Sequence, residues 1–257
     1  SSELNERINK MILPLANSFN CIDKILILRN EKNLFEKMKK YSVIYPRNYN
    51  PKYFIIEPLD FIKGYQFLKD DLFTIPFLKP IPLELINTNI SDKKLFYSKY
   101  ITLTLRDYGF SPSRNTNQSH IDLAIEVAKN LNFKLVIVPD DINKLKNYIF
   151  NSEVTISKMA RERMDFRINL YAKSQLNLFK PSGPQFVSLF SKKTKTIILD
   201  YCEGGFDSNE QYYIKEYNIR IGDQPYIKLD GYLLWKKIFP EIKISNILHA
   251  YNLLGLN

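Results

Sequence analysis

The stretch from residue 99 to residue 202 alternates between short β-branched apolar runs and amphipathic helical patterns. This alternation restricts the fold more than any other feature, because it favours an α/β protein with a doubly wound parallel sheet. The run KLVIV (134–138) is almost continuously apolar, as in strands buried on both faces of such a sheet. In SHIDLAIEVAKNLNF (119–133), apolar residues recur at helical spacing, and Ser119 is the expected N-cap. The expected strands are residues 100–106, 134–141, 176–181 and 195–201, and the expected helices are residues 119–133, 142–150, 156–175 and 183–191.

Residues 1–98 carry a weaker pattern than the remainder of the chain. Short apolar strands that close at a proline alternate there with short helical segments, which predicts a small N-terminal α/β subdomain. Three prolines within residues 75–89 are typical of a crossover or linker. The tail, with GYLLWKKIF (231–239) and SNILHAYNLLGL (245–256), has a helical pattern. We therefore expect two domains, residues 1–98 and residues 99–257, the second ending in helices.

The small numbers of histidines and cysteines, and the lack of a long apolar stretch, exclude several classes of protein. Two histidines cannot build a multi-histidine zinc site, and two cysteines far apart in sequence give neither a metal-binding spacing nor a disulfide framework. No apolar stretch is long enough to span a membrane, and the first residues lack the architecture of a secretion signal. A cytoplasmic location is expected, with reduced thiols and with no metal or cofactor.

The chain is basic, with 37 Lys and Arg against 27 Asp and Glu and a net charge of +10. This charge is compatible with an anionic partner such as a phosphorylated substrate, a nucleic acid or an acidic membrane face. It is equally compatible with coding bias, because the chain is rich in Lys, Asn and Ile, as products of AT-rich genes are. No motif of a nucleic-acid-binding protein is present, so nucleic acid is not an expected partner.

Charged, polar and small residues follow each of the four expected strands. The carboxyl ends of parallel strands meet at one edge of a sheet, where ligands of α/β proteins bind. Taken singly, each residue also fits a surface salt bridge, a turn or a helix cap; only the shared edge brings them together. The residues are Arg106, Asp107, Arg114 and Asn115 after the first strand, Asp140 and Asp141 after the second, Lys180, Ser182 and Gly183 after the third, and Glu203, Gly204 and Gly205 after the fourth.

These residue types suit a phosphorylated ligand. Arginine offers phosphate a planar fork of donors and stays charged. The free N–H groups of a helix that begins after Ser182 could take an anion, and Gly183 would let the backbone approach it closely. Acidic residues such as Asp140 can accept hydrogen bonds from sugar hydroxyls. His120, near a helix start just after the arginine loop, is the more plausible functional histidine of the two.

Four segments together resemble a family of bacterial glycosyltransferase-like proteins associated with surface-polysaccharide synthesis. The segments are ITLTLRDYGFSPSRNTN, KLVIVPDD, RINLYAKSQLNLFKPSGPQFVSLFS and IGDQPY. They look like the Rossmann-like C-terminal half of the GT-B fold and are distantly similar to fucosyltransferase-type enzymes. The resemblance covers residues 100–235 and implies that Arg106 binds the donor diphosphate. It further implies that Arg114 and Asn115 flank it, that Asp140 lies near the nucleoside, that Ser182 and Gly183 close the phosphate site, and that Lys180 and Gln224 join the substrate-binding set.

The function expected on this basis is metal-independent transfer of a sugar from a nucleotide diphosphate sugar to a hydroxyl of a glycan or lipid-linked acceptor. Arg106 would stabilise the departing diphosphate, and Asp107 and His120 are the candidate general bases. Contact with the inner face of a membrane would suit a lipid-linked acceptor. The alternative is a non-catalytic nucleotide- or sugar-binding domain, because the N-terminal region is small for an acceptor domain.

Overall fold

The computed structural model describes residues 2–18, 25, 98–109, 112–189, 195–199, 233–236 and 243–253. The chain divides into two compact units, one formed by residues 1–22 with 80–257 and the other by residues 23–79. Apart from Ile25, residues 19–97 lie outside the described residues. The α/β character of the expected N-terminal subdomain, and its boundary at residue 98, therefore stay predictions.

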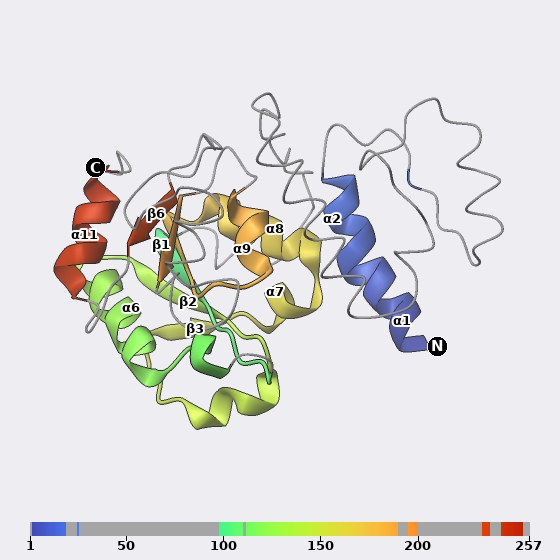
Figure 1. Cartoon of the computed structure of the whole chain (residues 1–257), viewed down its shortest axis with the longest axis horizontal. Helices are drawn as coiled ribbons and strands as arrows, with labels where there is room; N and C mark the ends of the chain where they lie inside the picture. The colour runs from blue at the N-terminus through green and yellow to red at the C-terminus, as the bar shows by residue number, and fades with distance from the viewer. Residues whose placement is uncertain are drawn as a thin grey trace, which may run out of the picture. The chain divides into compact units, whose positions relative to one another are not determined.

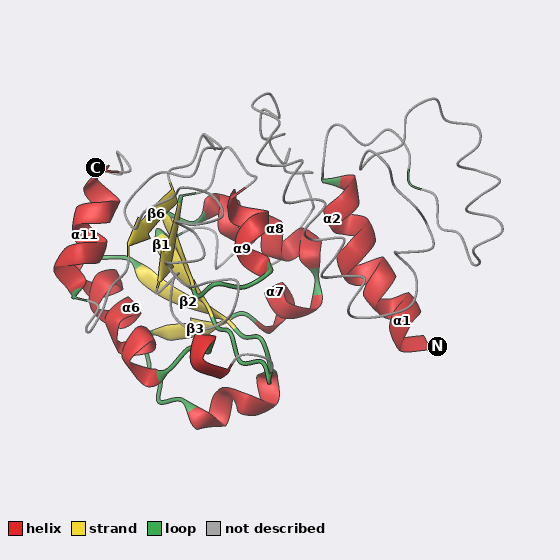
Figure 2. Cartoon of the chain, viewed as in Figure 1, coloured by secondary structure: helices red, strands yellow, loops and turns green. Residues whose placement is uncertain are grey.

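A parallel sheet forms the centre of the first unit (Figures 1 and 2). Five strands have the order β3-β2-β1-β4-β5, and β6 adds a sixth beyond β5, with every neighbouring pair parallel. This is the strand order of the Rossmann fold, so the expected α/β, Rossmann-like class is confirmed. The strands are β1 (Tyr100–Thr104), β2 (Lys134–Val138), β3 (Val154–Ile156), β4 (Leu176–Phe179), β5 (Thr196–Leu199) and β6 (Leu233–Lys236).

Helices cover the two faces of the sheet in separate groups (Figure 2). One face packs against α6 and α11, and the other against α7, α8 and α9. A helical run at the N-terminus, made of α1, a π-helical turn η1 and α2, packs against α8 on the second face. The bounds are α1 (Ser2–Arg7), η1 (Ile8–Ile12), α2 (Leu13–Asn17), η3 (Pro112–Arg114), α6 (Gln118–Asn130), η4 (Ile142–Asn147), α7 (Lys158–Glu162), α8 (Met164–Lys173), α9 (Pro184–Leu189) and α11 (Ile244–Leu253), with η3 and η4 as 3-10 helices.

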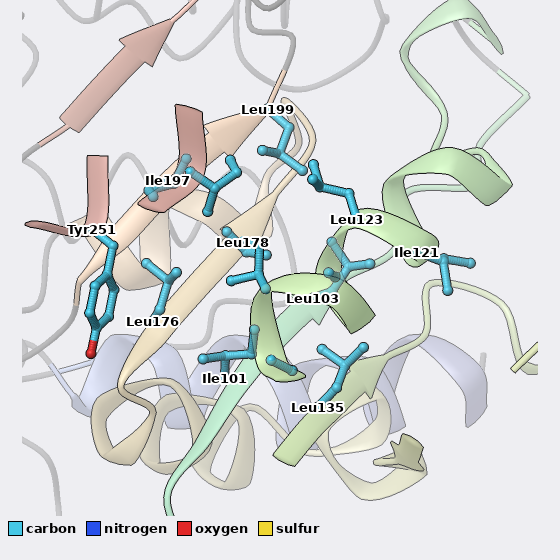
Figure 3. Close-up of a cluster of buried hydrophobic side chains, with 14 of the residues drawn as sticks. Ile101, Leu103, Ile121, Leu123, Leu135, Leu176, Leu178, Ile197, Leu199 and Tyr251 are labelled. Carbon is cyan, nitrogen blue, oxygen red and sulfur yellow. The ribbon is translucent and has the colours of Figure 1, made fainter. Parts of the chain in front are cut away.

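Alternation along the strands separates two buried layers. Odd-numbered β1 residues such as Ile101 and Leu103 pack beneath α6, and Tyr251 of α11 joins the same cluster (Figure 3). Even-numbered β1 residues are polar on the other face. Thr102 Oγ1 donates to Asn177 Oδ1 at 2.7 Å, and the hydroxyls of Thr104 and Tyr171 lie 2.8 Å apart. The buried side chains beneath α6 are thus apolar. On the other face, α8 covers a row of hydrogen-bonded polar side chains, Thr102, Thr104, Tyr171 and Asn177, which we call the polar row.

Three local expectations are wrong. The expected helix at residues 156–175 begins later and is broken at Arg163, whose backbone is extended (φ −129°, ψ 119°). The buried Arg167 side chain donates to the carbonyl of Ala160 at 2.5 Å, which gives this carbonyl a partner where the helix is interrupted. The segment around Leu233 is the edge strand β6 where a helix was expected, because pairing with β5 satisfies its backbone. Asn117, and not Ser119, caps α6.

Two elements have no counterpart among the expected ones: the helical run at residues 2–17 and the strand β3. Ile8, Met11 and Leu15 follow the spacing of a helical apolar face, and Met11 and Leu15 pack against the second layer. Pro14 lies in the first turn of α2, and the wider π turn just before it is a common response to a proline within a helix.

Replacement of Asn177 by alanine tests the polar row. Asn177 is fully buried, and its amide also donates to Tyr171 O at 3.0 Å, so Asn177→Ala leaves the Thr102 hydroxyl without its acceptor and leaves Tyr171 O with only the N–H of Ser174. We expect the free energy of unfolding, measured by urea denaturation, to fall by about 2 kcal/mol. The control is Asn130→Ala on the exposed side of α6, which should change it by less than about 0.5 kcal/mol. Equal effects of the two variants would contradict a structural role for the row.

Candidate functional site

The candidate site lies where the strand order reverses, between β1 and β4. The chain leaves β1 for α6 on one face and leaves β4 for α9 on the other face, so the two connections part at this point. In open α/β sheets, this reversal at the carboxyl edge is the usual place for a ligand. We call residues 105–109 and 112–117 after β1, Asp140 after β2 and residues 180–183 after β4 the junction site.

Arg106 is the residue that ties the two connections together. It is 7% exposed; its Nε donates to Pro181 O at 3.2 Å, and its Nη1 donates to Asn115 Oδ1 at 3.1 Å. Its backbone N–H donates to Thr116 Oγ1 at 2.9 Å, and its carbonyl accepts from Thr116 N at 2.8 Å. The guanidinium is therefore held at both its backbone and its side chain.

A second guanidinium meets the same carbonyl. Arg114, at the end of η3, donates from Nη2 to Pro181 O at 3.1 Å. Burial lowers the pKa of Arg106, and the charge of Arg114 lowers it further, whereas Asp140 acts in the opposite direction. Because the ordinary pKa of arginine is so high, both side chains remain charged at neutral pH. Two buried or half-buried cations thus share one neutral carbonyl oxygen.

Asn115 organises the turn that follows β1. Its Oδ1 accepts from Arg106 Nη1 and from the backbone N–H of Tyr108, both at 3.1 Å. Its Nδ2 donates to the carbonyl of Tyr108, again at 3.1 Å. The expected neighbourhood of Arg106, Arg114 and Asn115 is therefore present in the structure.

Acidic residues after β1 and β2 form the other side of the site. The Asp140 carboxylate accepts from the backbone N–H of Asp107 at 3.0 Å, and Lys144 forms an ion pair with Asp107 at 2.8 Å. Hydrogen bonding to Asp107 is the main reason that the pKa of Lys144 is raised. Asp141 accepts from Asn143 N at 2.9 Å and so caps η4, as its position before a helix suggests.

After β4, the chain places a buried lysine and a serine turn. Lys180 is fully buried, and the backbone N–H of Ser182 donates to the Gln185 side chain at 3.2 Å. The Ser182 Oγ atom is buried, and no partner for it is found in the described part of the chain. A Cβ added to Gly183 would meet no atom within 4 Å, so glycine is not sterically required there. The helix that follows, α9, has six residues.

His120 forms part of the N-terminal cap of α6. Its side chain is buried (4% exposed), and its ring Nδ1 accepts from Asn117 N at 3.2 Å. Its backbone N–H donates to Asn117 Oδ1 at 3.2 Å. This reciprocal pair is a capping box, in which histidine replaces the usual Glu or Gln. A catalytic role of His120 stays a prediction, and Gln224 lies outside the described residues.

Two contributors were missed by sequence reasoning. Thr116 binds both backbone groups of Arg106, and Arg161 of α7 donates from Nε to the carbonyl of Asp140 at 2.8 Å. Thr116 directly follows Arg114 and Asn115 in the loop after β1, and this position is the signal that could have identified it. Arg161 comes from another element, and no local pattern connects it to Asp140.

Comparisons with models of known protein families, with curated protein sequences and with solved structures find no match to this chain. The class that the fold defines is therefore an α/β protein with a Rossmann-like parallel sheet. Among the described residues, no helix is long and apolar enough to cross a membrane. The same residues contain no group of three or more His, Cys, Asp or Glu that could hold a metal ion.

Thr116→Val tests how much the Thr116 hydroxyl stabilises the junction site. The substitution keeps the shape of Thr116 and removes the hydroxyl that accepts from the buried Arg106 N–H. We expect a loss of about 1.5 kcal/mol in the free energy of unfolding, because an unpaired buried donor costs about 1–3 kcal/mol. Thr155→Val in β3 is the matched control and should be nearly neutral, since valine suits a strand. A neutral Thr116→Val variant in urea denaturation would contradict the anchoring role.

Proposed function

We propose that this chain binds a nucleotide diphosphate sugar at the junction site and transfers the sugar to a hydroxyl acceptor, as a GT-B-type glycosyltransferase of glycan or surface-polysaccharide synthesis. One observation carries the proposal. Arg106 and Arg114 converge on Pro181 O, at 3.2 and 3.1 Å, where the strand order reverses.

A diphosphate would suit this pair better than the carbonyl does. The carbonyl oxygen that both guanidiniums contact carries no net charge, so it leaves their mutual repulsion in place. Phosphate oxygens offer several charged acceptors and match the fork of each guanidinium. Burial and the charge of Arg114 lower the pKa of Arg106, and a bound anion would act in the opposite direction, as Asp140 does.

The proposed chemistry uses the arginines for the leaving group. The bond between the anomeric carbon and the β-phosphate oxygen breaks, and the diphosphate leaves with the electron pair. The acceptor oxygen forms the new bond to the anomeric carbon, and its proton passes to a general base, for which Asp107 and His120 are the candidates. Cations held in position before the reaction stabilise the departing charge without a cost of reorganisation.

The remaining substrate contacts follow from the same placement. Asp140 would accept from sugar hydroxyls, while Asn115 would keep Arg106 in position. Ser182, whose buried hydroxyl has no partner among the described residues, would donate to a phosphate oxygen. Lys180, Gly183 and Gln224 complete the proposed substrate-binding set, with Lys180 adding positive charge at the end of β4.

The alternative is a non-catalytic nucleotide- or sugar-binding domain. It is favoured by the state of the two candidate bases. The Asp107 carboxylate is paired with Lys144, and His120 Nδ1 accepts the N–H of Asn117 in the capping box. His120 would have to leave the capping box before its Nδ1 could accept a proton, and a proton on Asp107 would remove the charge that pairs with Lys144.

Thermal unfolding with nucleotides tests the binding step. The five common nucleoside diphosphates and their sugar conjugates are added to the wild type, Arg106→Gln and Arg114→Gln. One nucleoside diphosphate at about 100 times its dissociation constant should raise the melting temperature of the wild type by about 5 °C or more. The shift should vanish in both variants. The control is Arg163→Gln, whose side chain pairs with Asp165 and should keep the full shift. Absence of any shift in the wild type contradicts the proposal.

A transfer assay separates the enzyme from the binding domain. The donor that gives the thermal shift is incubated with a panel of glycan and lipid-linked acceptors, and transferred sugar is measured by mass spectrometry. For the enzyme, Asp107→Asn should lower transfer by about 100-fold or more while the thermal shift is retained, as for loss of a general base. Donor binding with no transfer to any acceptor would favour the alternative.

A further inference from the structure

We propose that Tyr108 is the platform on which the nucleobase of the ligand stacks. The inference rests on the proposed function, since it concerns a nucleoside diphosphate at the junction site. Tyr108 follows β1 by four residues and is 62% exposed, the most exposed large aromatic side chain in the described part of the chain. Single exposed apolar residues are common on proteins, so exposure alone is not the argument.

The backbone of Tyr108 is fixed although its ring is exposed. Asn115 accepts from its N–H and donates to its carbonyl, both at 3.1 Å. A turn that only connects two elements would not need hydrogen bonds to both backbone groups of an exposed residue. A fixed backbone favours stacking on a ligand, because less conformational entropy is lost when the ligand binds.

Asn115 also holds the backbone of Tyr108 close to the cations. Its Oδ1 accepts from the Tyr108 N–H and from Arg106 Nη1 at the same time. Burial is the largest influence on the pKa of Arg106 and lowers it, and Tyr108 is among the groups that act to raise it. The backbone of Tyr108 and the Arg106 guanidinium are thus joined through one amide oxygen.

The positions of the surrounding groups suggest a direction for a bound nucleoside. Its diphosphate would lie at Arg106 and Arg114, and its ribose hydroxyls at Asp140. The Asp140 carboxylate accepts from the backbone N–H of Asp107, the residue just before Tyr108. Phosphate, ribose and base would thus follow the order of Arg106, Asp107 and Tyr108 along the chain, and Tyr108 is the aromatic residue among the described residues of this turn.

Stacking predicts a particular pattern of affinities. The face of an aromatic ring accepts every base, so Tyr108 should strengthen the binding of any nucleoside diphosphate that binds. It should add nothing to inorganic pyrophosphate, which has the same phosphates and no base. Comparing the affinities for these two ligands separates the contribution of the Tyr108 ring from that of the two arginines.

The experiment is titration calorimetry of the full chain with ADP, GDP, UDP, CDP, dTDP and inorganic pyrophosphate. We expect Tyr108→Ala to weaken binding of the preferred nucleoside diphosphate by about tenfold or more and to change pyrophosphate binding by less than about twofold. Tyr108→Phe keeps the ring and should bind like the wild type. Ile149→Ala, at a side chain that is 78% exposed, is the control for loss of an exposed apolar group and should also bind like the wild type.

The outcomes separate the two proposals. A wild type that binds neither pyrophosphate nor any nucleoside diphosphate overturns both. A wild type that binds them, with binding lost in Arg106→Gln but unchanged in Tyr108→Ala, overturns the stacking inference alone. Equal weakening of pyrophosphate and nucleoside diphosphate in Tyr108→Ala overturns it as well, because the loss would then lie in the turn and not in the ring. The unchanged affinity of Tyr108→Phe excludes the hydroxyl as the cause.

Discussion

The pairing of β1 with β2 on one side and β4 on the other is the constraint on which the remaining structure depends. It reverses the direction in which strands are added, and therefore sends the connection after β1 and the connection after β4 to opposite faces of the sheet. Arg106 and Pro181 are 75 residues apart in sequence and yet come out at the same point. The side-chain bond between Thr102 and Asn177 strengthens this pairing from within the sheet. Few other places in the sheet could bring two guanidiniums to one acceptor.

The fold could be predicted where the local pattern and the tertiary packing agree. The four strands of the alternating region, the long helix after β1 and the C-terminal helix all have such patterns, and they are present. The strand β3 has three residues, too few for a periodic signal. The break at Arg163 has no glycine or proline to signal it. It is accompanied by a side-chain contact, from Arg167 to the carbonyl of Ala160, that the apolar pattern of the sequence does not show. β6 has an apolar run that suits a helix equally well, and only its neighbour β5 decides its structure.

For the candidate site, the sequence predicts which residues gather and not how they bond. Position after a strand was enough to bring Arg106, Arg114 and Asn115 into one group. It could not show that both guanidiniums would donate to the carbonyl of Pro181, because a backbone oxygen has no signature in the sequence. Nor could it show that His120 is committed to the helix cap, since the capping box normally uses Glu or Gln at that position. Hydrogen-bond partners depend on geometry across elements, and local patterns do not contain it.

The capping box at the start of α6 has a consequence for how such a site could change over time. In many sheets of this kind, the N–H groups at the start of the first helix hold the phosphate, and backbone groups are the same whatever the side chains are. Here the capping box uses two of those groups, the backbone N–H of Asn117 and that of His120, within the helix itself. An anion at the junction site then depends more on side chains, each specified by a single codon. Recognition at this edge can be gained, retuned or lost by one substitution at a time, while the sheet beneath it stays as it is.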